Sequence, residues 1–162
     1  MILHRSLTIF TIVLLGLAAL GCGIGGHAAR FPTAVTTFAG RDGAFGEPFG
    51  IAVRDGDLYV SDGEKDCIWK IDQQGKAVGF ASGLNTPSQI AFLPDGSMIV
   101  ADTGSNTIRS IDSSGANKVI AGIIGEAGDN DGASTEARFR APIGVAVGKD
   151  GRIFVADSYN DR

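Results

Sequence analysis

The sequence predicts an all-β protein built from repeated four-stranded units. Glycine is abundant, with 24 in 162 residues, and glycine suits tight turns but lowers the stability of helices. The apolar runs are short, rich in Val, Ile and Phe, and bounded by turn residues, which is typical of strands. The same order of runs returns along the chain, and such self-similarity indicates a repeat architecture.

The N-terminal residues are predicted to be an export signal that lies outside the fold. Arg5 precedes an uncharged, mostly apolar run, Ser6–Leu20, and small residues surround Cys22. This is the order of a secretory signal, and the run is shorter than the roughly 20 residues of a membrane-spanning helix. We therefore expect a signal peptide over 1–21 and a tether over 22–33.

The segment Leu17–Cys22 resembles a bacterial lipobox, in which the cysteine is acylated and becomes the first residue of the mature protein. The resemblance implies lipidation at Cys22 and an exported lipoprotein at the outer membrane, in the periplasm or on the cell surface. The membrane would then be contacted only through this lipid anchor. A simple cleaved signal and an uncleaved anchor are the alternatives.

The repeat itself starts at Pro48. Pro48-Phe-Gly-Ile-Ala-Val53 returns as Pro87-Ser-Gln-Ile-Ala-Phe92 and as Pro142-Ile-Gly-Val-Ala-Val147, while Leu58–Asp62 returns as Met98–Asp102 and Ile153–Asp157. Asp62 and Asp102 are 40 residues apart, and Asp157 follows 55 residues later because of an insert. A period near 40 with four strands in each unit predicts the blades of a β-propeller.

The units divide the rest of the chain in order. We expect an outer strand over 34–40, blades over 48–83 and 87–122, the insert over 123–141, and a partial blade over 142–162. In the second blade the strands are expected near 88–93, 97–102, 107–112 and 117–122, with glycine in the intervening turns. A propeller closes into a ring of at least four blades. About two and a half blades therefore predict a C-terminally truncated fragment that needs the missing blades for closure.

The chain resembles the NHL-repeat β-propeller proteins over about Val35 to Arg162. The resemblance is carried by Pro-x-Gly-Ile-Ala-Val, by the Val-Ala-Asp that ends the second strand, and by Ser105-Asn-Thr-Ile-Arg109. It implies a fold of six blades, related to the gluconolactonase and regucalcin-like propellers. Those relatives include calcium-dependent lactonases and lyases, so an enzyme with most of its metal ligands in the missing blades is the alternative to a non-catalytic binding module.

Composition limits the chemistry of the protein. The formal net charge is −4, which disfavours nucleic acid as a partner. The two histidines, His4 and His27, both precede the propeller segment, so no histidine is available there for acid–base catalysis or zinc binding. We predict no catalytic residue and no bound cofactor in this segment, with calcium as the open alternative.

Binding is expected on one face of the propeller. Loops from the fourth to the first strand and from the second to the third emerge together, and loops on a rigid scaffold often bind ligands. A protein, peptide or glycan is the expected partner. The candidate residues on this face are Asp62, Asp66, Asp102, Asn106, Asp129, Asp131, Asp157 and Tyr159.

Several of these candidates have a second interpretation. Asp62, Asp102 and Asp157 follow the repeat, so they are expected to cap the turns of their own blades rather than to bind a ligand. Asp129 opens a calcium-like sequence, but Arg140 stands where an EF-hand loop needs its bidentate Glu. Glu47 breaks the repeat just before Pro48 and is a weak candidate for a metal ligand.

Overall fold

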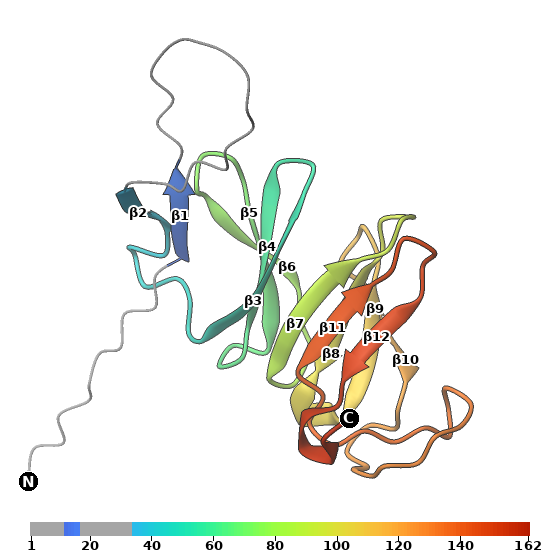
Figure 1. Ribbon diagram of the computed structural model, residues 1–162. Coiled ribbons are helices and arrows are strands. Elements are labelled where there is room, and N and C mark those ends of the chain that lie inside the picture. The colour runs from blue at the N-terminus through green and yellow to red at the C-terminus, as the bar shows by residue number, and fades with distance from the viewer. Residues whose placement is uncertain (1–11, 17–33) are drawn as a thin grey trace, which may run out of the picture.

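The computed structural model describes residues 12–16 and 34–162, and this part of the chain is an all-β sector of a propeller (Figure 1). Two complete four-stranded antiparallel sheets lie side by side, each in sequential strand order. These sheets are the predicted blades. The first contains β3 (Pro48–Arg54), β4 (Asp57–Asp62), β5 (Cys67–Ile71) and β6 (Ala77–Ala81), and the second contains β7 (Pro87–Phe92), β8 (Met98–Asp102), β9 (Thr107–Ile111) and β10 (Asn117–Ala121).

A two-stranded sheet lies at each end of this pair. At the C-terminal end, β11 (Gly144–Val147) and β12 (Ile153–Ala156) are the first two strands of a third blade. At the N-terminal end, β1 (Ile12–Gly16) pairs with β2 (Ala34–Ala39). Two short 3-10 turns, Thr103–Ser105 and Ser158–Asn160, follow the second strands of blades two and three. Within these described residues no helix has the length and apolar character to span a membrane.

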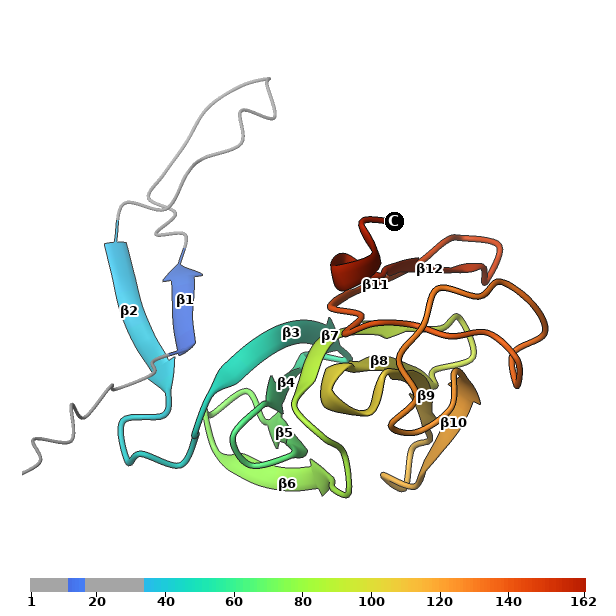
Figure 2. The ribbon, with the colours of Figure 1, turned by 90° about the horizontal axis from the view of Figure 1, so that it is seen from below.

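Neighbouring blades are held together by the stripe of apolar residues on each first strand. In blade two, Ile90 is buried in one cluster with Tyr59 of blade one and with Leu84 in the loop between the two blades. In blade three, Val145 is buried in a cluster with Ile99 and Ala101 of blade two. Figure 2 shows the first strands β3, β7 and β11 following one another along one side of the sector. The blades therefore share cores with their neighbours rather than folding around separate ones.

Outer turns also fit against the preceding outer strand, and a glycine in each turn makes this contact possible. Gly115, in the turn between β9 and β10, has a φ of 87°, and a Cβ atom there would collide with the carbonyl oxygen of Phe80 on β6. Gly75 has the same relation to Phe38 on β2, where a Cβ atom would lie 2.7 Å from the carbonyl oxygen. The strand β2 is thus placed against blade one in the same way as the outer strand β6 is placed against blade two.

The segment around β1 was not predicted to be part of the fold. Sequence analysis assigned residues 1–21 to a signal peptide, whereas the structure places Ile12–Gly16 as a strand along the edge of β2. An unpaired strand edge offers free backbone donors and acceptors, and an apolar segment nearby can satisfy them. Cys22 and the predicted tether over 22–33 lie outside the described residues.

We predict that Gly115→Ala destabilises the fold far more than Gly43→Ala. Both glycines have positive φ values, but a Cβ atom at Gly43 meets nothing within 4 Å. Gly43→Ala should therefore cost only the roughly 1–2 kcal/mol of the backbone conformation. Gly115→Ala adds a steric clash of about 1–3 kcal/mol. Equal urea midpoints for the two variants would contradict the proposed contact between the outer turn and β6.

Candidate binding face

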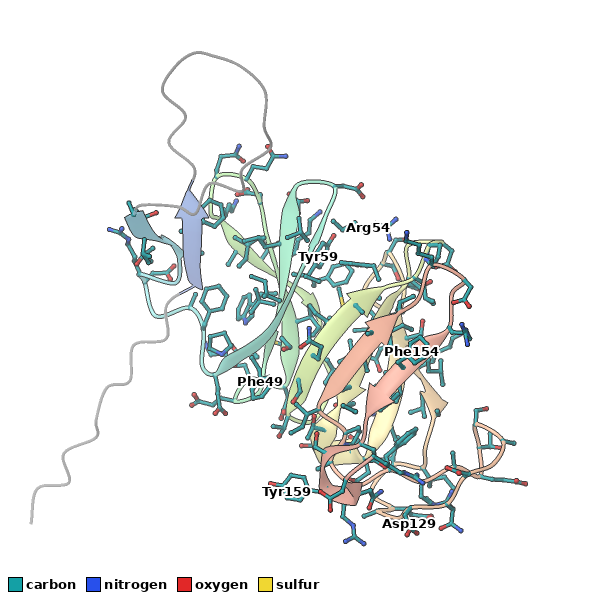
Figure 3. The ribbon with its side chains drawn as sticks, viewed as in Figure 1. Phe49, Arg54, Tyr59, Asp129, Phe154 and Tyr159 are labelled. Carbon is teal, nitrogen blue, oxygen red and sulfur yellow. The ribbon has the colours of Figure 1, made fainter. Side chains whose placement is uncertain are left out.

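The loops that join the blades gather at one end of the strands, as the sequence predicted. Loops into each first strand and loops from each second to each third strand share this end, which we call the loop face. Tyr159 and Asp129 lie at the loop face, whereas Arg54, the last residue of β3, lies at the opposite end (Figure 3).

Asp62 is buried beneath the loop face, and its carboxylate accepts hydrogen bonds from its own blade and from the loop that enters it. Its carboxylate accepts hydrogen bonds from the backbone N–H groups of Gly46 at 2.8 Å and Glu47 at 2.9 Å, and from the indole Nε1–H of Trp69 at 3.0 Å. Burial alone raises the pKa of this group, but the hydrogen bonds from Glu47, Gly46, Trp69 and Lys65 together lower the pKa below its usual value. Asp62 therefore stays ionised while buried.

The equivalent acids repeat this arrangement with different donors. Asp102 accepts the N–H of Asn85 at 2.6 Å and the Nε–H of Arg109 at 2.6 Å. Asp157 accepts the N–H of Arg140 at 2.8 Å and the Nε–H of Arg162 at 3.3 Å. Trp69, Arg109 and Arg162 thus supply the same kind of support at successive blades. Each acid holds the loop that enters its blade, and this geometry favours the capping interpretation over a ligand-binding one.

Asp66 and Asn106 link one blade to the next. Both have a left-handed backbone, with φ values of 52° and 56°. The Oδ1 atom of Asp66 accepts the N–H of Thr86 at 2.7 Å, and the Oδ1 atom of Asn106 accepts the N–H of Ala141 at 2.8 Å. Both accepted N–H groups lie just before the proline that opens the following blade. These two candidates therefore have a defined structural role at the edge of the loop face.

Glu47 is exposed at the position equivalent to Thr86 and Ala141. Its own N–H is bound by Asp62, within the same blade, at 2.9 Å. In the part of the chain that the structure describes, no group of three or more His, Cys, Asp or Glu side chains is placed to hold a metal ion. Among these residues, Glu47 is therefore not part of such a group.

The insert between β10 and β11 is ordered by its own contacts. Gly122 N–H donates to the carbonyl of Ser134 at 3.0 Å, and Gly128 N–H donates to the carbonyl of Phe139 at 3.1 Å. Arg138 forms an ion pair with Glu126 at 2.9 Å. The insert is therefore folded on itself instead of extending freely.

Arg162 and Asn160 fasten the insert to the end of blade three. The guanidinium of Arg162 donates to the carbonyl of Asp129 at 2.7 Å and to the carboxylate of Asp131 at 3.0 Å. The side-chain amide of Asn160 donates to the carbonyl of Gly128 at 2.6 Å. Tyr159, which directly precedes Asn160, is 68% exposed. The candidates Asp129, Asp131 and Tyr159 therefore belong to one surface, which we call the insert surface.

Trp69 and Cys67 on β5 are both packed against neighbouring residues. The ring of Trp69 packs edge-on against Phe45, with centroids 5.8 Å apart. The thiol of Cys67 is half-buried, and burial together with the nearby negative charge of Asp62 raises its pKa to about 11. Cys67 is therefore a neutral thiol at physiological pH, with little of the thiolate that a nucleophile needs.

A hollow of about 430 Å³ lies at the end opposite the loop face, between blades one and two. It is lined by the aromatic side chains of Tyr59, Phe80 and Phe92, and by charged groups that include Arg54 and Lys70. Tyr59 contacts both phenylalanines edge-on, with centroid distances of 5.1 and 5.2 Å. Sequence analysis missed this hollow, although Tyr59 does depart from the aliphatic Ile99 at the equivalent position.

The fold and the repeated capping acids define this chain as part of a β-propeller. Residues 139–162 match the family model described as the NHL repeat, so the chain contains an NHL repeat. A curated relative, the chloroplastic protein SUPPRESSOR OF QUENCHING 1 of Arabidopsis thaliana, is 25% identical over 142 residues, which cover 72% of this chain and 14% of the relative.

Solved propellers share the fold. Virginiamycin B lyase from Staphylococcus aureus matches with a TM-score of 0.56 and 19% identity, over 72% of this chain and 36% of that one. A gluconolactonase from Xanthomonas campestris matches with a TM-score of 0.57 and 16% identity, over 70% and 35%. An auxiliary nutrient binding protein from Bacteroides thetaiotaomicron matches with a TM-score of 0.60 and 19% identity, over 69% and 35%. The chain spans about a third of the length of these structures.

We predict that Asp62→Asn makes the stability of the protein less sensitive to acid. Because the folded pKa of Asp62 lies below its unfolded value of about 3.9, its ionised form contributes stability above that pH, and the contribution is lost as the pH falls through the folded pKa. The variant should be less stable than the parent at pH 7, and the difference should shrink as the pH falls below the unfolded pKa of about 3.9.

Thermal melting across this pH range measures the effect. The turn carboxylates Asp95, Asp112 and Asp150 have pKa values lowered by hydrogen bonds from Ser97, Ser114 and Arg152, so the variant keeps part of the acid dependence. Parallel curves for the parent and the variant would show that Asp62 does not cap its blade as an anion.

Proposed function

We propose that this protein is a non-catalytic binding module outside the cytoplasm, which presents the insert surface to a protein, peptide or glycan. One observation carries the proposal: Tyr159 is exposed on a loop that is fixed on both sides. Asn160 and Arg162 bind the insert, and the N–H of Tyr159 donates to the carbonyl of Arg140 at 3.2 Å. The loop is already ordered, so little conformational entropy is lost when a partner binds, as at other preorganised surfaces.

The chemistry of the insert surface suits a polar partner. Tyrosine supplies a large contact area and a hydroxyl group, and exposed tyrosines are common at the energetic centres of interfaces. Asp129, Asp131 and Glu136 are exposed around the insert and can accept hydrogen bonds from sugar hydroxyls or peptide N–H groups. The likeness of the fold to the nutrient binding protein of Bacteroides thetaiotaomicron supports a binding role.

The proposed location follows from the N-terminal segment. Export and lipidation at Cys22 would place the loop face in the periplasm or on the cell surface, held by a lipid. Cleavage before Cys22 would also remove Ile12–Gly16 and leave the edge of β2 unpaired. An exported chain processed at Cys22 would therefore lack β1.

A propeller enzyme is the second candidate, because virginiamycin B lyase and a gluconolactonase share the fold. In that case most metal ligands would come from blades beyond these residues, with Glu47 as a contributor from this sector. Calcium-dependent hydrolysis of gluconolactone by a longer natural chain that contains this sequence would favour the enzyme over the binding module.

We predict that Tyr159→Ala weakens ligand binding at least tenfold without changing stability. Ligands would first be selected from a glycan array and a random-peptide library with the parent chain, and affinities would then be measured by calorimetry. Val78→Ala is the control, because Val78 is also exposed but lies on β6, outside the insert surface. Equal losses in both variants, or no loss in Tyr159→Ala, would show that the insert surface does not bind the selected ligands.

A further inference from the structure

The hollow between blades one and two has both of its walls present. Tyr59 on β4 and Phe80 on β6 form the side that belongs to blade one, and Phe92 on β7 and Met98 on β8 form the side that belongs to blade two. Each of these sheets has its four strands, so the hollow does not depend on the open faces of β3 and β12. Its volume of about 430 Å³ lies within the range of roughly 300–1,000 Å³ that is usual for small-molecule sites.

The aromatic and cationic side chains around the hollow break the repeat. The next interface, between blades two and three, has aliphatic or small residues at the equivalent positions. Tyr59, Phe80, Phe92, Arg54 and Lys70 correspond there to Ile99, Ile120, Val147, Leu93 and Ser110. The four aliphatic residues of this second set pack into one cluster. Packing of one blade on the next therefore does not require three rings and two cations at this place.

The other charged groups around the hollow have partners of their own. Asp95 and Asp112 each accept a backbone N–H from their own turn at 2.8 Å. The equivalent acids in the other blades, Asp72 and Asp150, cap their turns in the same way. Both Asp95 and Asp112 are exposed, so water and salt screen their charges. Lys70 is paired with Asp57, with 2.9 Å between Nζ and the carboxylate.

Arg54 keeps part of its hydrogen-bonding capacity free. Its guanidinium lies over the ring of Phe92, with Cζ 5.3 Å from the centroid, and against the backbone of Gly96, where a Cβ atom would overlap it. Among the residues that the structure describes, only the Nε–H of Arg54 donates, to the exposed Asp55 at 3.2 Å. The Nη1 and Nη2 groups can therefore hold a carboxylate by two parallel hydrogen bonds.

We propose that this hollow binds a small aromatic carboxylate. The carboxylate is held by Nη1 and Nη2 of Arg54, and the ring system of the ligand lies between Phe80 and Phe92. Tyr59 supplies an apolar surface between these two rings, since it contacts both edge-on with centroid distances of 5.1 and 5.2 Å. The site is at the end opposite the loop face, so it is independent of the binding proposed for the insert surface.

A ligand with a positive group fits the hollow less well. Aromatic rings attract cations over their faces, but here the protein's own cations already occupy those positions. Arg54 lies over Phe92, and Lys70 lies over Tyr59 with Nζ 5.9 Å from the ring centroid. A ligand ammonium group would be repelled by both. The side chain of Arg54 is only 34% exposed, so its attraction for an anion is screened less than that of a fully exposed group.

Calorimetric titration of the chain with 2-naphthoate, a carboxylate with two fused rings, tests the proposal. The uncharged 2-naphthamide has nearly the same shape and isolates the contribution of the charge. The parent should bind 2-naphthoate at least tenfold more tightly than 2-naphthamide, because hydrogen bonds between charged groups are strong. Arg54→Gln should lose at least tenfold in affinity for 2-naphthoate and keep its affinity for 2-naphthamide.

Arg152→Gln is the matched control for Arg54→Gln. Arg152 also lies over an aromatic ring, that of Phe154 at 5.6 Å, but it is outside the hollow. Its replacement should leave both affinities unchanged. Equal affinities of the parent for the two probes, equal losses in the two arginine variants, or no binding at millimolar concentration would overturn the proposal. Tighter binding of the cation 2-naphthylmethylamine would overturn it as well.

A second pair of variants locates the rings of the probe. Phe80→Ile introduces the residue type that blade two has at this position, Ile120, and should weaken the binding of both probes at least fivefold. Phe154→Ile, on the open face of blade three, and Tyr159→Ala, on the insert surface, should leave both affinities unchanged. A loss in either of these two variants without a loss in Phe80→Ile would place the probe elsewhere and overturn the proposal.

Discussion

Blades two and three are each stabilised by the apolar stripe of the first strand, which is buried against the blade before it. Ile90 packs in this way against blade one and Val145 against blade two, and the cores of the sector are these contacts between sheets. A four-stranded antiparallel sheet has two faces. In this sector, a face is buried only where a neighbouring blade packs against it. The stability of the sector, the exposure of Ile51 and Phe154, and the position of the loop face all depend on this one repeated contact.

The buried acids connect this packing to the functional surface. Asp62, Asp102 and Asp157 each receive backbone N–H groups from the loop that enters their blade. A buried carboxylate is unfavourable unless hydrogen bonds or charges compensate for lost water, and here the loops and the side chains of Trp69, Arg109 and Arg162 provide them. The result is a rigid rim from which the less regular insert and Tyr159 are displayed. Repeated residues build the scaffold, and the insert and Tyr159 depart from the repeat.

Much of the fold could be predicted from the sequence because propeller blades repeat their turns and apolar runs. The second blade shows this most clearly: strands were expected near 88–93 and 107–112, and β7 and β9 lie at Pro87–Phe92 and Thr107–Ile111. The repeat also indicated that Asp102 would cap a turn. The strand at Ile12–Gly16 could not be predicted, because its apolar residues suit a signal peptide equally well and only the free edge of β2 makes them a strand.

The candidate site was predictable only in part, because several of its contacts join residues that are distant in the sequence. Periodicity placed Tyr159 and the insert on one face, but the hydrogen bonds that fasten the insert to Arg162 and Asn160 join residues about thirty positions apart and leave no local signal. The hollow around Tyr59, Phe80 and Phe92 likewise forms between two blades. It is a property of how the blades pack and not of either blade alone.

The most direct test of this account is a double-mutant cycle across the first blade interface. Tyr59 on β4 and Phe92 on β7 contact each other edge-on, with centroids 5.2 Å apart. If blade one packs on blade two as described, the free energies of unfolding of Tyr59→Ala, Phe92→Ala and the double variant should show a coupling of about 0.5–1.5 kcal/mol. Strictly additive losses would contradict the packing of one blade on the next, on which the rest of the structure depends.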